Sequence, residues 1–309
     1  MVRLDLNLRV ITMSRTRARA NGSRPALSVL LMLLAMLATR AVPIRAQAIR
    51  DSTADPPPAF ASDDSAHVSK TFFTRHDLVT AGVGVASTAV VSIFDTRIAH
   101  WTRHPDVQGT SSRHRFVQDV SNLTGETTLT WATVVTYGVG RFTHDTTIAD
   151  VSLHLIEAQA LTSVMGQLVR GVLGRARPSV NLDSAYSFHW GKGFTKFDYR
   201  AFPSLHSAAG FIVASGILQE MRERHAGGQA VAAPLLYGFA LLPGVSRMYI
   251  NQHWASDVFA GAFLGTFIGT RVVHYAHTHK RTKLDRALLG LTAMPTGSGS
   301  VMVGESFGW

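Results

Sequence analysis

Three short stretches of the sequence combine residue types that could bind an anion and transfer a group from it. In the first stretch, Arg170, Arg175 and Arg177 follow one another closely, with no acidic residue among them. The planar guanidinium group suits the oxygens of a tetrahedral oxyanion, so a cluster of unpaired arginines indicates an anion site. A helix that ends in cations favoured by its dipole would show the same residues, and this stretch alone leaves both explanations open.

The second stretch is Phe202-Pro203-Ser204-Leu205-His206. Proline followed by serine is typical of a helix start, and the free N–H groups of a first helical turn attract phosphate. His206 would then lie beside the bound anion. Taken alone, Ser204 as a helix cap and His206 as a surface residue would explain the stretch equally simply.

The third stretch holds Ser246, Arg247, His253 and Asp257. On a helix that begins near His253, the i,i+4 spacing places the Asp257 carboxylate on the same face as the imidazole. A carboxylate that accepts the proton of one ring nitrogen fixes the tautomer and leaves the other nitrogen free to attack. A buried histidine–aspartate pair that serves only packing would have the same spacing.

Together, in this order, the three stretches resemble the signature of the type 2 phosphatidic acid phosphatase superfamily, which also holds bacterial acid phosphatases and vanadium haloperoxidases. That signature is Lys, six intervening residues and Arg-Pro, then Pro-Ser-Gly-His, then Ser-Arg, five residues, His, three residues and Asp. The chain matches it at residues 177–178, 203–206 and 246–257, except that Arg170 replaces the lysine and Leu205 replaces the glycine. Arg170 keeps the charge, whereas Leu205 would add a side chain beside the pocket.

The resemblance covers residues 78–274 and implies a metal-independent phosphatase with a histidine nucleophile. His253 would attack phosphorus and form a phosphohistidine, Asp257 would orient it, and His206 would protonate the leaving oxygen and then activate water. The residues implied to hold the phosphate oxygens are Arg170, Arg177, Ser204, Leu205 (through its N–H) and Arg247. Because arginines supply the positive charge, no metal ion or other cofactor is implied, and Arg175 is expected to be a bystander.

The expected substrate is a phosphorylated small molecule or a lipid phosphate, that is, a phosphate monoester or a lipid diphosphate. The segment 180–202 is rich in aromatic residues and could form a wall for a lipid tail. Two alternatives stay open: a vanadium-dependent haloperoxidase-like enzyme, against which Arg170 argues, and a degenerate phosphate-binding or transport module. The module is less expected, since simple binding would need neither His253 nor His206.

The net charge of +10 does not indicate nucleic-acid binding, because it is concentrated at the start of the chain. Residues 1–50 hold nine arginines and one acidic residue, which leaves a charge of only +2 on the rest. The chain has no cysteine, so disulfides and thiolate metal sites are excluded. His274, His277 and His279 have no acidic residue or cysteine nearby in the sequence, so we expect a solvated helix end and no metal site there.

The organisation along the chain predicts four parts. Residues 1–48 combine arginines, an apolar run and a small-x-small motif, which is typical of an export signal or an uncleaved hydrophobic leader. A proline-containing linker is expected over residues 49–75, and the helical phosphatase domain over residues 76–286. The tail, residues 287–309, is expected to form a short β-hairpin from Leu288–Met294 and Val301–Phe307.

The domain itself is expected to be an all-α, six-helix bundle, because its apolar segments are too long for ordinary strands. The six predicted helices are Leu78–Phe94, Thr127–Gly140, Ser152–Leu173, Leu205–Met221, Val231–Val245 and Trp254–His274. Gly261, Gly265 and Gly269 recur every four residues on the last one, which predicts a flat stripe for close helix packing.

The leader predicts a bacterial cell-envelope protein, exported or membrane-associated, and we leave its oligomeric state open. None of the six segments has eighteen consecutive uncharged residues, which favours core helices over membrane spans. However, basic residues gather in alternate loops, as the positive-inside rule requires of a membrane protein. The three motif stretches stand in the opposite loops, so we expect the active site to face the periplasm.

Overall fold

The structure is a computed structural model that describes residues 74–279, 291–295 and 301–305. The predicted leader, residues 1–48, the predicted linker up to residue 73 and the predicted boundary at residue 286 lie outside these residues. The division of the chain into a leader, a linker and a helical domain therefore stays a prediction.

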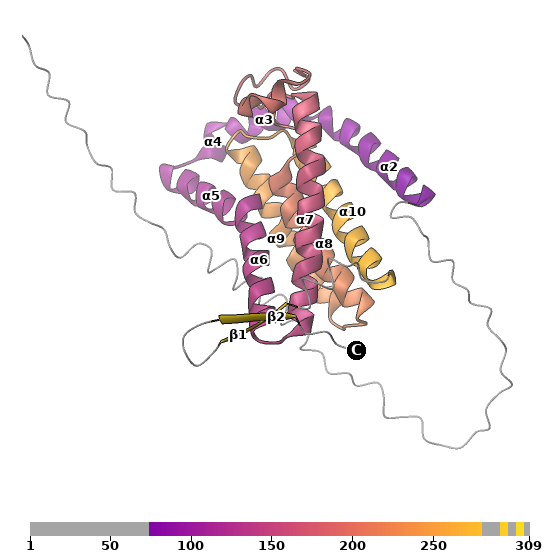
Figure 1. Cartoon of the computed structure of the whole chain (residues 1–309). Coiled ribbons are helices and arrows are strands. Elements are labelled where there is room, and N and C mark those ends of the chain that lie inside the picture. Colours follow the sequence, from indigo (N-terminus) through magenta and orange to yellow (C-terminus); the bar gives the residue numbers. More distant parts are fainter. Residues whose placement is uncertain (1–73, 280–290, 296–300, 306–309) are drawn as a thin grey trace, which may run out of the picture.

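The described part is mainly helical, which confirms the predicted all-α bundle (Figure 1). Each of the six apolar segments forms a helix, at nearly the predicted bounds. These helices are α2 (Arg75–Ser92), α6 (Glu126–Phe142), α7 (Thr146–Leu173), α8 (Leu205–Glu223), α9 (Gln229–Tyr249) and α10 (Ala255–Thr278). Helices α6 to α10 run side by side along the long axis of the bundle, and α2 extends outward along α10 (Figure 1).

Three further helices in the described part were not predicted, so the count of six is wrong. They are α3 (Asp95–Arg103), α4 (Pro105–Gln108) and α5 (Ser111–Leu123), and two 3-10 turns are added by η1 (Lys192–Phe194) and η2 (Phe197–Tyr199). The cause is their polar composition, because a search for apolar runs passes over short amphipathic helices. Their starts carry ordinary signals: Thr110 caps α5, and Pro105 opens α4.

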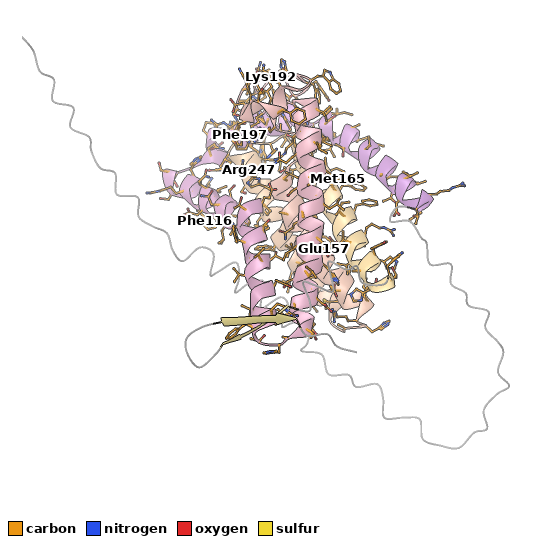
Figure 2. All side chains as sticks on the ribbon, viewed as in Figure 1. Phe116, Glu157, Met165, Lys192, Phe197 and Arg247 are labelled. Atoms are coloured by element: carbon orange, nitrogen blue, oxygen red, sulfur yellow. The ribbon has the colours of Figure 1, made fainter. Side chains whose placement is uncertain are left out.

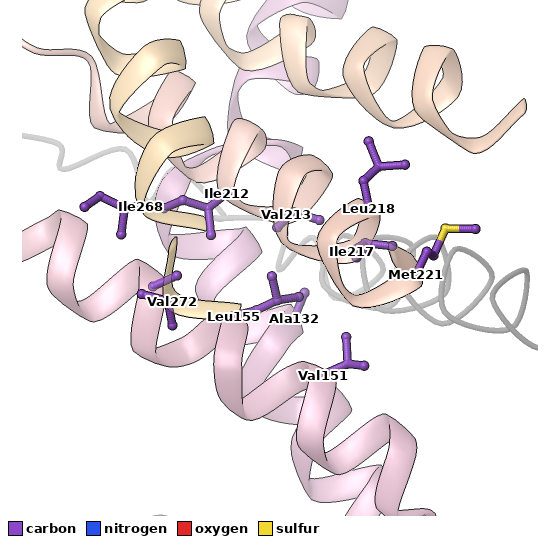
Figure 3. Close-up of a cluster of buried hydrophobic side chains, with 11 residues drawn as sticks. Ala132, Val151, Leu155, Ile212, Val213, Ile217, Leu218, Met221, Ile268 and Val272 are labelled. Atoms are coloured by element: carbon purple, nitrogen blue, oxygen red, sulfur yellow. The ribbon is translucent and has the colours of Figure 1, made fainter. Parts of the chain in front are cut away.

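The core lies where α7, α8 and α10 meet, with Ala132 of α6 at its side (Figure 3). Leu155 and Ile268 are fully buried there. The predicted glycine stripe of α10 faces α8 closely: a Cβ on Gly261 would lie 2.1 Å from the carbonyl oxygen of Ser204, and one on Gly265 would lie 2.3 Å from that of Ala208. Any side chain at these positions would push the two helices apart.

This close packing sets the relative position of the starts of α8 and α10. The N–H of Ser204 donates to the carbonyl oxygen of Asp257 over 2.9 Å, and the Ser207 hydroxyl donates to that of Val258, also over 2.9 Å. The second and third motif stretches are therefore joined directly by hydrogen bonds.

The last two described segments form an antiparallel pair of strands, β1 (Leu291–Pro295) and β2 (Val301–Glu305), and Leu291 lies opposite Glu305. A hairpin is predicted at this place, but both strands are shorter than the predicted segments. Pro295 belongs to β1 rather than to the turn. The strand β1 lies beside α6 (Figure 1).

Among the described residues, α9 alone is long and apolar enough to cross a membrane by itself. The consecutive pair α2 and α3, bent by 54°, passes the same test together. Many large apolar side chains point outward, among them Val85 of α2 (72% exposed) and Leu235 of α9 (70%). An exposed apolar surface of this kind is typical of contact with a membrane or another protein.

Candidate active site

The candidate site lies at the end of the bundle where α7 and α9 finish and α8 and α10 begin. Helix α7 stops at Gly174, which adopts a left-handed conformation with φ of 56°. A Cβ there would lie 1.8 Å from the carbonyl oxygen of His189, so only glycine lets the following loop cross so closely. The loop covers this end of the bundle, with Lys192 and Phe197 above Arg247 in the view of Figure 2.

The predicted nucleophile, His253, is buried in the short connection between α9 and α10, with 2% of its surface exposed. Its Nδ1 lies 2.7 Å from the carbonyl oxygen of Ala201, which must accept a proton from it. Its Nε2 has no hydrogen-bond partner among the described residues. Burial, and next the charge of Arg177, hold the pKa of His253 well below its usual range, so the imidazole is neutral and Nε2 keeps its lone pair.

Asp257 shares a face with His253, as the i,i+4 spacing predicts, but it does not fix the tautomer. Its Oδ2 lies 3.6 Å from His253 Nδ1, too far for a hydrogen bond. That oxygen instead accepts the backbone N–H of Trp254 over 2.8 Å. The carbonyl of Ala201 therefore takes the orienting position that the sequence assigned to Asp257, which contributes negative charge near the ring.

The three predicted anion-binding arginines come from separate elements and are held by carbonyl and amide oxygens. Arg170 Nε donates to the carbonyl oxygen of Pro203 over 2.8 Å. Arg177 Nη1 and Arg247 Nη2 both donate to Gln252 Oε1, so one amide side chain aligns two guanidinium groups. Gln252 was not predicted, although it directly precedes His253.

None of these three arginines forms an ion pair within the part of the chain that the structure describes. Arg170 Nη2 and Arg247 Nε are buried there without a hydrogen-bond partner. The pKa of Arg177 is lowered to about 9, mainly by burial and secondly by the charge of Arg247. Buried cations that repel one another and lack an acidic partner form a site that an anion would complete.

His206 stands in the first turn of α8, where it faces the same arginines. Its ring centroid lies 6.4 Å from that of His253, and its Nδ1 is buried without a partner among the described residues. The pKa of His206 is lowered to about 2, mainly by burial and secondly by the charge of Arg247. The same charges would attract an anion, whose own charge would raise this pKa again.

Ser204 is the N-cap of α8, and its hydroxyl oxygen accepts the N–H of Ser207 over 3.4 Å. The N–H groups of Leu205 and His206 form no hydrogen bond within the described residues, which leaves them available to an anion. The Leu205 side chain is 1% exposed and packs against α7, where a Cβ on Gly166 would lie 2.3 Å from its Cδ2. The sequence predicted a Leu205 side chain beside the pocket, whereas the structure packs it against Gly166 of α7.

The sequence led us to expect that Arg175 is a bystander, and the structure contradicts this. It is 2% exposed, and its guanidinium donates to Asp257 Oδ1 over 2.5 Å, to Asp95 Oδ2 over 2.7 Å and to the carbonyl oxygen of Ala185. Asp95 also accepts the N–H of Ser256 over 2.8 Å. No sequence signal pointed to Asp95, which stands outside every motif stretch, whereas Arg175 lies two residues from Arg177.

Comparison with other proteins gives one family and one solved structure. A crystal structure of a transmembrane PAP2-type phosphatidylglycerolphosphate phosphatase from Bacillus subtilis is similar to 67% of this chain and 98% of that chain, with 17% sequence identity and a TM-score of 0.46. No curated protein sequence matches the chain. Residues 151–281, which hold all three motif stretches, match the family model of the PAP2 superfamily, and this confirms the resemblance predicted from them.

Proposed function

We propose that this protein is a phosphatase that transfers a phosphoryl group from an ester or diphosphate to His253 and then to water. The observation that carries the proposal is that the buried Arg170 and Arg177 and the half-buried Arg247, none of them in an ion pair within the described residues, face two imidazoles. Each imidazole has a buried nitrogen without a hydrogen-bond partner there. The PAP2 match over residues 151–281 supports a phosphatase of this superfamily. A binding module would need the cations but not the two histidines.

In the first step, His253 Nε2 attacks phosphorus while the bond to the leaving oxygen breaks. That oxygen takes a proton from His206, which requires His206 to be protonated in the substrate complex. Because a phosphate dianion beside the ring favours the charged imidazolium, substrate binding itself supplies this condition. Arg170, Arg177 and Arg247 stabilise the charge on the oxygens that do not react.

In the second step, water attacks the phosphohistidine. His206, now neutral, takes a proton from this water, and the bond between phosphorus and Nε2 breaks. Inorganic phosphate leaves, and His253 returns to its neutral form. The Ala201 carbonyl holds the proton on Nδ1 throughout, so Nε2 is the nitrogen that attacks and departs.

We propose a lipid phosphate as the substrate class. The loop over the site exposes large aromatic side chains, with Trp190 at 75%, Phe197 at 60% and Phe194 at 54%. A groove of about 460 Å³ runs beside it, lined by Val164 and Leu168 of α7 together with Phe194. Aromatic side chains at the mouth of a charged pocket would lie at a membrane surface, where they contact acyl chains.

The outward apolar side chains of α2, α6, α7 and α9 favour association with a membrane of the cell envelope. Arg141 ends α6, and Arg222 and Arg224 end α8, at the end of the bundle opposite the site. The positive-inside rule would place that end in the cytoplasm and the active site on the periplasmic side.

A substrate panel tests the reaction and the lipid preference. Phosphate release by the full chain in detergent would be measured with glycerol 3-phosphate, phosphatidate, and short and long isoprenoid diphosphates. We expect a higher kcat/KM for the substrates with long apolar tails, because the soluble ester cannot use the groove. Equal or better hydrolysis of glycerol 3-phosphate would contradict the lipid assignment but leave the phosphatase intact.

The nucleophile is tested separately with His253→Ala. Loss of a covalent nucleophile should lower kcat by at least about a thousandfold. The matched control is His100→Ala at the same end of the bundle, whose side chain is 53% exposed. Rapid quenching with radiolabelled phosphatidate should trap acid-labile, base-stable label on the wild type and none on His253→Ala. Near-normal turnover by His253→Ala would disprove the mechanism.

A further inference from the structure

A second cluster of ionisable side chains lies at the other end of α7, α8 and α10. His154 stands 16 residues before Arg170 on α7, and Glu220 stands 14 residues after His206 on α8. At a rise of 1.5 Å per residue, these separations are about 24 and 21 Å along the two helices. The cluster is thus remote from the candidate phosphate pocket, and nothing in the proposed phosphatase chemistry uses it.

The cluster is formed by two imidazoles on one carboxylate, each from a different helix. His154 Nδ1 lies 2.5 Å from Glu220 Oε1, and His277 Nε2 lies 3.0 Å from Glu220 Oε2. One ligand atom from each residue can be chosen so that all three lie within 4.8 Å of one another. The Glu220 side chain is 1% exposed, whereas His154 and His277 are 13% and 25% exposed, so the cluster can be reached from one side.

The neighbours of Glu220 would hold a liganding carboxylate in place. Arg224 Nε donates to Glu220 Oε2 over 2.9 Å, and its Nη2 lies 3.6 Å from Asp150 Oδ2. Carboxylate ligands of metals are commonly oriented by such outer hydrogen bonds. Glu220 and Asp150 carry two negative charges beside the single positive charge of Arg224, so the carboxylates near the two imidazoles would attract a cation.

We propose that His154, Glu220 and His277 form a binding site for a divalent transition-metal ion, best suited to Zn²⁺. Two imidazole nitrogens and one carboxylate are a common Zn²⁺ ligand set, with a fourth position left to water. In the bound state His154 Nδ1 and His277 Nε2 would hold the ion, with the one proton of each ring on its other nitrogen, His154 Nε2 and His277 Nδ1. The ion would tie α7, α8 and α10 together at the end of the bundle far from the phosphate pocket.

This site could not be predicted from the sequence, because His277 has no acidic residue nearby along the chain. The fold supplies Glu220 from 57 residues away and His154 from a third helix. His274 makes a useful comparison. It lies one turn before His277 on α10, but its Nδ1 contacts Glu223 over 2.9 Å and not Glu220.

The test is Zn²⁺ binding by the full, untagged chain, measured by equilibrium dialysis and elemental analysis. We expect one Zn²⁺ per chain for the wild type and for the control His274→Gln. His154→Gln and His277→Gln should each bind it at least about a hundredfold more weakly, since even outer partners contribute up to that factor. Co²⁺ should give visible ligand-field bands in the wild type and in His274→Gln only.

Two results would overturn the proposal. One is a wild type that binds no Zn²⁺ at micromolar concentration, in which case the cluster is a metal-free polar contact between helices. The other is unchanged binding by both His154→Gln and His277→Gln, which would place the ion elsewhere. If the variants do not fold, the melting temperature of the wild type is measured instead. It must rise with added Zn²⁺ and fall in EDTA. An unchanged melting temperature would reject the site.

Discussion

The guanidinium of Arg175 donates to Asp257 Oδ1 over 2.5 Å at a point where both side chains are almost fully buried. Burial raises the pKa of Asp257, and the charge of Arg175 acts against that rise. The same guanidinium holds Asp95 of α3. One arginine thus links the loop over the site, α3 and the start of α10, and it does so without contacting the anion pocket.

Replacing Arg175 by lysine should therefore damage both stability and turnover. The single nitrogen of lysine cannot reach the acceptors that three separate guanidinium nitrogens bond here, and breaking a buried ion pair costs about 3–5 kcal/mol. We expect a loss of about 3 kcal/mol in unfolding free energy. Because Asp257 acts through its position beside His253, kcat should fall by roughly tenfold while KM changes by less than about twofold.

Arg103→Lys on the exposed surface of α3 is the control for this substitution. The stability of each variant would be measured by denaturant unfolding, and kcat and KM by phosphate release. An Arg175→Lys variant as stable as Arg103→Lys would mean that the network contributes nothing. A change in KM alone would indicate that Arg175 contacts the substrate, and not that it positions Asp257.

The buried histidines predict that the protein loses stability in weak acid. The pKa of His206 is lowered to about 2, so the folded protein leaves this ring neutral at pH 5, whereas the unfolded chain protonates it below about 6.5. The unfolded state then binds more protons, and the unfolding free energy falls as the pH falls. Each such histidine contributes about 1.4 kcal/mol per pH unit well below 6.5.

His206→Asn removes one of these groups, so its unfolding free energy should depend less steeply on pH than that of the wild type. Unfolding curves at several values between pH 7 and pH 5 would measure the two slopes. At pH 5 the difference between the two slopes should approach the value for one proton, about 1.4 kcal/mol per pH unit. Equal slopes would show that His206 is not held neutral in the folded protein, and would remove the reason to expect that substrate binding protonates it.

Much of this structure could be predicted from the sequence, because the relevant signals are local. Apolar segments gave the six long helices, and motif spacing gave the residues that meet at one end of the bundle. The sequence does not reveal contacts between residues that only the fold brings together. The Ala201 carbonyl has no side-chain signature, Asp95 is remote from the motifs, and the space for Leu205 depends on Gly166 of another helix.

The anion pocket predicts inhibition by vanadate and activity without added metal. The trigonal-bipyramidal form of orthovanadate resembles the transition state of phosphoryl transfer, so it should compete with the substrate. Initial rates at 25 °C should survive EDTA, because arginines carry the positive charge at the site. Loss of the rate in EDTA, restored by Mg²⁺ at the same protein stability, would place a metal ion in the phosphate chemistry.

Orientation in the envelope is the last prediction, and it can be tested because the chain has no cysteine. Thr195 is exposed in the loop over the site, whereas Ala230 is exposed near the start of α9 at the opposite end. Thr195→Cys should react in intact spheroplasts with a maleimide that cannot cross the inner membrane. Ala230→Cys should react only after lysis, because the end of the bundle that holds the basic ends of α6 and α8 is expected in the cytoplasm. The reverse pattern would invert the proposed topology. Labelling of both positions before lysis would instead indicate a protein wholly outside the inner membrane, and alkaline carbonate washing would then show whether it is bound to the membrane at all.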